Sequence, residues 1–152
     1  MNWTVVQRIL GQLLMMFSVS LLPPLAVSWY YNDQSWLPFV ESFVLILMAG
    51  TLAWFPVRNK SKDLRLRDGF LVVAFFWTVL GTAGALPLLL AEAPSMSFTD
   101  AVFESMSGLT TTGATVLTGL DTLPRSVLFY RQQLQWMGGM GIIVLAVAVL
   151  PM

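Results

Sequence analysis

A run of threonines around one glycine carries the residues best suited to bind an ion in this sequence. The run reads Thr110-Thr111-Thr112-Gly113-Ala114-Thr115. In an extended strand, backbone carbonyls of such a run can point at a pore axis and replace the hydration shell of a cation. Threonine hydroxyls add further oxygen ligands, and Gly113 supplies backbone angles that residues with a side chain avoid. The run therefore predicts one strand of a cation filter.

The segment before this run favours the filter over the simpler alternative, a turn. Ser97–Leu109 begins with Ser97 and Asp100 at the spacing of a helix-capping pair. Its apolar residues recur at steps of three and four, which predicts a helix. About 13 residues give roughly 20 Å, too short to cross a bilayer. The C-terminal end of such a helix carries about half a negative charge, which favours a cation.

Longer apolar stretches surround this short helix. They are Ile9–Tyr31, Leu37–Val57, Gly69–Ala91 and Val127–Leu150. Each has about 21 to 24 residues, or roughly 31–36 Å of helix, enough to cross a hydrocarbon core of about 30 Å. Pro23 and Pro24 are expected to kink or end the first of these helices.

The composition indicates an all-α integral membrane protein. Hydrophobic residues make up 57% of the 152 residues and charged residues 11%, against about 25% charged in soluble domains. The net charge is zero, so nothing indicates a nucleic-acid partner. Cysteine and histidine are absent, which removes thiol and imidazole chemistry. We expect no enzyme, because Asp100 and Asp121 fall near the outer surface and no aspartate pair lies at mid-membrane depth.

The basic residues predict the orientation in the membrane. Five of the eight lie in one loop, namely Arg58, Lys60, Lys62, Arg65 and Arg67. By the positive-inside rule this loop and the N-terminus are cytoplasmic. The short helix and Val127 then both start on the outer side, so the chain between them must enter the membrane and return. Arg125 and Arg131 also fall on the outer side, against the rule.

Two long motifs make the sequence recognisable. Phe103–Thr115 resembles the first pore loop of the Trk/Ktr/HKT superfamily of cation transporters, and Gln135–Leu145 resembles the inner helix of the first repeat in that family. Arg8–Gly11, Phe76–Gly81 and Gly84–Pro87 fit the bacterial Trk branch. The resemblance covers essentially the whole chain.

This resemblance implies a potassium-channel-like fold of four repeats around one pore, preceded by two extra helices. Residues 1–58 would be the leading transmembrane pair, 59–68 the basic cytoplasmic loop, and 69–152 the first repeat. Within that repeat we expect a helix at 69–91, a pore helix at 97–109, the filter at 110–115 and an inner helix at 127–150. Family members are roughly three times as long, so we expect this chain to be a fragment holding one quarter of the pore.

The resemblance also implies the ion and the partners. Gly113 occupies a place where serine goes with sodium permeation, so it favours potassium, bound by Thr111, Thr112 and Gly113. We expect potassium uptake, by a channel or a symporter, with no organic cofactor. The expected location is the bacterial inner membrane. The expected partners are the lipid bilayer, the three remaining repeats, a second copy in a homodimer of the full-length protein, and a cytoplasmic nucleotide-binding regulatory subunit.

Other candidate residues have two interpretations each. Glu104 and Arg131 are ionisable residues near the membrane; they would either pair and support the pore helix or lie separately near the headgroups. Gly138, Gly139 and Gly141 would provide close helix packing, which is favoured. The alternative is a flexible point or a place where the helix passes close to the filter or gate.

Two alternative functions remain open from the sequence. A four-helix chain could serve as a non-conducting membrane scaffold or accessory subunit. A homotetramer with one loop per chain could also form a pore, but the filter lacks the tyrosine of simple tetrameric potassium channels.

Overall fold

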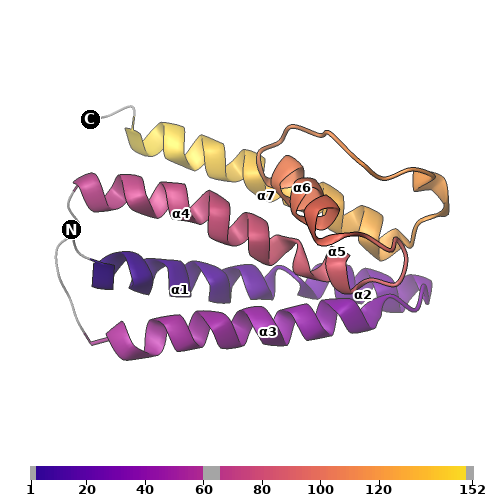
Figure 1. The fold of residues 1–152 in the computed structure, drawn as a ribbon, viewed down its shortest axis with the longest axis horizontal. Helices are drawn as coiled ribbons and strands as arrows, with labels where there is room; N and C mark the ends of the chain where they lie inside the picture. Colours follow the sequence, from indigo (N-terminus) through magenta and orange to yellow (C-terminus); the bar gives the residue numbers. More distant parts are fainter. Residues whose placement is uncertain (1–2, 60–65, 150–152) are drawn as a thin grey trace.

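The computed structural model describes residues 3–59 and 66–149, and within these ranges its regular elements are all helical (Figure 1). The elements in chain order are α1 (Trp3–Val19), α2 (Leu22–Tyr31), α3 (Trp36–Trp54), η1 (Phe55–Val57), α4 (Leu66–Gly84), α5 (Leu86–Leu90), α6 (Phe98–Leu109), η2 (Leu120–Thr122) and α7 (Arg125–Val149). The predicted all-α class is confirmed. Leu150, which ends the predicted inner helix, lies outside the described residues.

The long helices run side by side along the longest axis of the molecule (Figure 1). Helix α1 packs on α3 and α4, while the short α6 lies between α4 and α7. At the α1–α3 crossing, a Cβ built on Gly11 would lie 2.9 Å from the carbonyl oxygen of Gly50. Small residues of this kind let membrane helices approach closely. The crossing therefore fixes α1 against α3.

Proline interrupts the first apolar stretch, as predicted. Helix α1 ends at Val19 and α2 begins at Leu22, with proline in its first turn. Proline lacks a backbone N–H, so it is tolerated in a first turn, where that group has no intrahelical partner.

A second interruption, which the sequence analysis did not predict, lies within the helix expected over 69–91. Helix α4 ends at Gly84 and α5 begins at Leu86, with Pro87 in its first turn. The N–H of Ala85 bonds to the Thr82 carbonyl at 3.2 Å, a tighter turn than an α-helix makes. The same proline rule applies here, so the sequence contained the signal.

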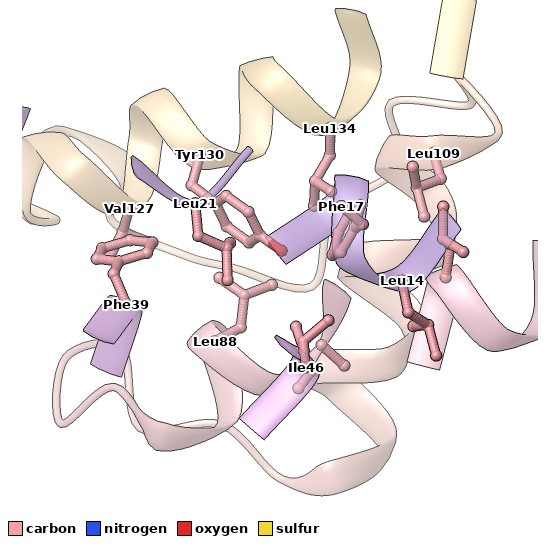
Figure 2. Packing of buried hydrophobic residues seen from close by; sticks show 13 residues of the cluster. Leu14, Phe17, Leu21, Phe39, Ile46, Leu88, Leu109, Val127, Tyr130 and Leu134 are labelled. Atoms are coloured by element: carbon pink, nitrogen blue, oxygen red, sulfur yellow. The ribbon is translucent and has the colours of Figure 1, made fainter. Parts of the chain in front are cut away.

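The buried core lies where both interruptions meet α7. Tyr130 and Leu134 of α7 project into this core beside Leu21 and Phe17, close to the α1–α2 interruption (Figure 2). Leu88 of α5 is fully buried in the same cluster. The core thus joins the first two helices, the α4–α5 unit and α7 into one packed body.

Much of the remaining apolar surface is exposed, which fits a lipid environment. Trp29 is 87% exposed, Phe70 78% and Leu52 76%. Within the described residues, three helical segments are long and apolar enough to cross a membrane: Trp3–Tyr31, Trp36–Val57 and Gly69–Leu90. The chain is therefore a multi-pass membrane protein.

Two basic residues lie at one end of the bundle and two acidic residues at the other. The start of α1 meets the end of α3, where the Gln7 side chain donates to the Ala53 carbonyl, so Arg8 and Arg58 lie at one end. Asp33 and Glu92 line one surface hollow at the other end. Lys60, Lys62 and Arg65 of the predicted basic loop lie outside the described residues.

Candidate functional site

Helix α6 directs its C-terminal end at the run Thr110–Thr115, which we call the candidate filter segment. The helix starts at the predicted cap: the Ser97 hydroxyl accepts from the Asp100 N–H at 3.2 Å and donates to the Asp100 carboxylate at 2.7 Å. With 12 residues it is only about 18 Å long. The segment that follows it is exposed in the isolated chain.

Backbone N–H groups of the candidate filter segment fold back onto the end of α6. The N–H groups of Thr112 and Gly113 both donate to the Ser107 carbonyl, at 2.9 and 3.4 Å. The N–H of Thr111 donates to the Gly108 carbonyl at 2.9 Å. Converging N–H groups of this kind form a backbone nest, here filled by a helix carbonyl. The carbonyls of Ser107 and Gly108 are thereby satisfied by backbone N–H groups.

The direction of these N–H groups fixes the direction of the carbonyls. In a trans peptide the C=O of one residue points opposite to the N–H of the next. The carbonyls of Thr110, Thr111 and Thr112 therefore point away from α6. Among the described residues none of these oxygens accepts a hydrogen bond. Three consecutive oxygens therefore lie on the side of the backbone that faces away from α6.

The backbone achieves this by alternating its handedness, which differs from the extended strand predicted from sequence. Thr110 has φ −82°, Thr111 φ +57° and Gly113 φ +74°. In an extended strand successive residues face opposite sides, whereas alternating right- and left-handed residues turn successive peptides the same way. A positive φ at a β-branched residue such as Thr111 costs about 1–3 kcal/mol. Strain of this size persists where the surrounding contacts enforce it.

The hydroxyls of the segment are partly engaged within it. Thr110 Oγ1 donates to the Met106 carbonyl at 2.7 Å and lies 2.8 Å from Thr112 Oγ1. These bonds hold both side chains beside the end of α6. The backbone oxygens, rather than these hydroxyls, are therefore the most available ligands.

Ala114 ends the set of outward carbonyls. Its carbonyl accepts from the Ser107 hydroxyl at 2.6 Å, so it points back at α6. Ser107 thus contacts the segment twice, through its carbonyl and its hydroxyl. The sequence prediction included Ala114 in the filter strand, and the structure turns its oxygen the other way.

Glu104 and Arg131 lie in contact, so the structure brings this predicted pair together. Arg131 Nη2 lies 3.4 Å from each carboxylate oxygen of Glu104, and the side chains are 10% and 1% exposed. The Thr115 hydroxyl also donates to Glu104 and accepts from the Leu117 N–H at 3.1 Å. The carboxylate therefore joins α6, α7 and the end of the candidate filter segment.

The three glycines of α7 occupy different environments. A Cβ on Gly138 would overlap the Leu109 carbonyl oxygen at the end of α6. A Cβ on Gly139 would make an ordinary contact of 3.7 Å with Thr111 Cγ2, and one on Gly141 would meet no described atom within 4 Å. Gly138 therefore provides the close packing that the sequence favoured, beside the candidate filter segment.

Sequence reasoning missed three polar residues that complete this region. Ser107 is one of them. Tyr130 donates its hydroxyl to the Gly84 carbonyl at 2.7 Å, and the Gln133 side-chain amide donates to the Ser20 carbonyl at 2.6 Å. Both carbonyls sit at helix interruptions, where backbone groups at membrane depth need partners. A glutamine inside an apolar stretch was the available signal for Gln133.

The arrangement offers uncharged oxygen ligands. Among the described residues, no group of three acidic side chains converges as a metal site would require. The Glu104 carboxylate is occupied by Arg131 and Thr115. Carbonyl oxygens aligned along one side of a backbone are the ligands of potassium filters.

Comparison with known proteins identifies relatives of this chain. The sequence matches the TrkH family, described as cation transport protein, over residues 37–152. It is 57% identical over 151 residues to the Trk system potassium uptake protein TrkH of Vibrio parahaemolyticus, covering 99% of this chain and 31% of that protein. Escherichia coli K12 TrkH is 52% identical over the same share of each chain.

A solved structure shares the fold. The crystal structure of the potassium transporter TrkH from Vibrio parahaemolyticus superposes with a TM-score of 0.95 at 56% identity, covering 100% of this chain and 32% of that one. The chain thus spans about a third of the length of these relatives. It belongs to the TrkH family of cation transport proteins.

Proposed function

We propose that this chain contributes the first of four filter strands to a potassium uptake pore. The observation that carries the proposal is that the carbonyls of Thr110, Thr111 and Thr112 point away from α6, with no hydrogen-bond donor bound among the described residues. The names of the relatives, potassium uptake proteins, supply the ion.

The ion would be held by backbone oxygens and would undergo no covalent chemistry, so we propose a transporter rather than an enzyme. Carbonyls of Thr110 to Thr112 would replace part of the hydration shell. Gly113 would supply the second left-handed position that keeps them aligned. The C-terminal end of α6 places its partial negative charge beside the same ion.

The remaining oxygens would come from three further repeats. Residues 110–115 are exposed here, which supports a surface completed by other parts of a longer protein. In this proposal residues 1–58 are the leading helix pair, 59–68 the basic loop and 69–152 the first repeat. Helix α7, with 25 residues or about 37 Å, would be the fourth membrane crossing.

The proposed setting is the bacterial inner membrane, with the N-terminus in the cytoplasm. The separation of Arg8 and Arg58 from Asp33 and Glu92 along the bundle supports this orientation. The family resemblance suggests a homodimer of the longer protein and a cytoplasmic nucleotide-binding regulatory subunit.

The test is potassium uptake in cells that lack their own uptake systems. One strain would express this chain alone. Another would express a chimaera in which this chain replaces the matching N-terminal part of Vibrio parahaemolyticus TrkH. We expect uptake only by the chimaera, with potassium favoured over sodium.

Point variants of the chimaera connect uptake to the site. Gly113→Asp is expected to abolish uptake, whereas the matched loop variant Asn59→Ala is expected to retain it. Equal behaviour of the two variants would contradict a filter at Gly113. Uptake by the short chain alone would indicate self-assembly, and an inactive chimaera that reaches the membrane would favour a scaffold role.

A further inference from the structure

The first turn of α7 is capped by a residue from a distant part of the chain. Helix α7 starts at Arg125, so the N–H of Ser126 has no acceptor within the helix. The residue before the helix is Pro124, whose side chain cannot accept a hydrogen bond. The Ser126 N–H donates instead to Asp33 Oδ2 at 2.9 Å. A carboxylate here also complements the positive end of the helix dipole.

The Asp33 carboxylate is itself fixed in the turn between α2 and α3. Its other oxygen, Oδ1, accepts from the Ser28 hydroxyl and from the Ser35 N–H, the latter at 3.1 Å. The Asp33 N–H donates to the Ser28 carbonyl at 3.3 Å. The carboxylate therefore belongs to the leading helices and reaches out to α7.

Further contacts extend this attachment along one face of α7. Tyr130 packs edge-on against Phe39 of α3, with ring centroids 5.6 Å apart. Gln133 donates to the Ser20 carbonyl at 2.6 Å. Ser126, Tyr130 and Gln133 are spaced by four and three residues, so they share a face of the helix.

A neighbouring face of α7 contacts α6 and the candidate filter segment. Arg131 pairs with Glu104 at 3.4 Å, and Glu104 accepts from the Thr115 hydroxyl. A Cβ on Gly138 would overlap the end of α6. Because a helix is stiff over two turns, the position of its first turn helps to determine where Arg131 lies.

We propose that Asp33 is a positioning residue for the filter, acting through the first turn of α7 and the Arg131–Glu104 pair. The inference rests on the proposed function, since it gives the leading helices a role in potassium selection. In this proposal the leading helices do more than anchor the chain in the membrane. They set the position of α7 along its own axis, and its rotation, relative to α6.

The chain has no cysteine, so one introduced cysteine can report on the filter without any transport measurement. A spin label at Val116→Cys, directly after the candidate filter segment, would be measured in the full chain in lipid nanodiscs. Asp33→Asn keeps the size of the side chain but replaces one acceptor oxygen with an amide donor. We expect a markedly larger mobile component of the label signal in this variant.

Two further variants accompany Asp33→Asn: one is a control for the loss of charge, and the other weakens the same contact. Asp121→Asn removes the same charge from an exposed residue of η2 and should leave the label unchanged. Ser28→Ala removes one donor that orients the Asp33 carboxylate and should give a smaller change in the same direction. A label that reports no change in both Asp33→Asn and Ser28→Ala would overturn the inference.

Potassium uptake by the chimaera provides a second measurement. Asp33→Asn should weaken the apparent affinity for potassium about tenfold, the size of effect of one lost charge-assisted hydrogen bond, and lower the potassium-to-sodium uptake ratio. A lower maximal rate with unchanged affinity and ratio would contradict a positioning role. If the unmodified chimaera carried no potassium, the proposed function would fail, while the label measurement would still decide whether Asp33 positions this segment.

Discussion

The two ends of helix α6 are capped in different ways. Side chains cap the N-terminal end, whereas N–H groups of the following backbone bond the carbonyls at the C-terminal end. At the N-terminal end, Ser97 and Asp100 bond to each other three residues apart, near the surface. At the C-terminal end, the N–H groups of Thr112 and Gly113 converge on the buried Ser107. One end is a local cap, whereas the other depends on the path of the next several residues.

The difference shows how a helix end becomes a site. A side-chain cap satisfies N–H groups and leaves the following chain unconstrained. The backbone nest at Ser107 satisfies the helix carbonyls and, in doing so, turns three other carbonyls outward. The C-terminal end also requires support from a distance, through Glu104 and Arg131. Changes at the two ends should therefore differ in their effect on ion selection more than in their effect on stability.

The largest effect is expected at the distant support. Arg131→Gln leaves the Glu104 carboxylate buried without its cation, which should lower the free energy of unfolding by about 3–5 kcal/mol. Chemical unfolding of the chimaera in detergent measures this loss. The double variant with Glu104→Gln should lose less than the sum of the two single variants, because the pair acts as a unit. Strict additivity would show that the two side chains do not interact.

A smaller loss is expected where α7 passes the end of α6. Gly138→Ala places a methyl group against the Leu109 carbonyl and should cost about 1–3 kcal/mol by overpacking. Gly141→Ala is the matched control, since its Cβ would meet nothing within 4 Å in the part of the chain that the structure describes. Melting temperatures of the two variants should separate clearly, and similar values would mean that α7 does not approach α6 as described.

Two variants, one at each end of α6, should lower the free energy of unfolding by nearly the same amount and can then be compared in ion selection. Ser97→Ala removes the cap and Gly113→Ala forces a side chain into φ +74°; each should cost about 1 kcal/mol. Only Gly113→Ala should lower the potassium-to-sodium uptake ratio of the chimaera. An equal fall in the ratio for both variants would remove the distinction between the ends.

The smallest effect concerns pH at the first turn of α7. Burial raises the pKa of Asp33, but hydrogen bonds from Ser28, Ser126 and Ser35 outweigh it and hold the pKa below its ordinary value. The stabilisation should therefore be complete above the unfolded pKa of about 3.9 and be lost as pH falls through the folded pKa. The melting-temperature difference between the unmodified chimaera and its Asp33→Asn variant should narrow below about pH 4.

Charged residues near Asp33 provide the control for this titration. Glu41 and Glu92 line the same surface hollow as Asp33, and Arg125 precedes Ser126. Glu41→Gln should leave the narrowing in place. If the melting-temperature difference caused by Asp33→Asn stays constant down to about pH 3, below the ordinary pKa of an aspartate, the carboxylate does not contribute in its ionised form.

Local patterns made much of the helical layout predictable. The Ser97 cap, the length of α6 and the interruption at Pro23 follow from residues within one or two turns. The interruption before Pro87 obeys the same rule and was missed in an apolar run. These features depend on neighbouring residues, which a sequence displays directly.

The geometry of the candidate filter segment was less predictable, because its causes are not local. Thr111 adopts a positive φ although threonine disfavours it, since the Ser107 and Gly108 carbonyls bind the N–H groups around it. Ala114 turns inward because of a hydroxyl seven residues earlier. Asp33 caps a helix 93 residues away, which no spacing rule indicates.

The most direct measurement follows single backbone carbonyls while the ion is exchanged. The chimaera would carry ¹³C at the carbonyls of Thr111, Thr112 or Ala114, and solid-state NMR in lipid would compare potassium with a large organic cation. We predict that the Thr111 and Thr112 resonances shift with potassium and that the Ala114 resonance does not. A shift at Ala114 as large as at Thr111, or no shift at any of the three, would contradict a filter built from the outward carbonyls.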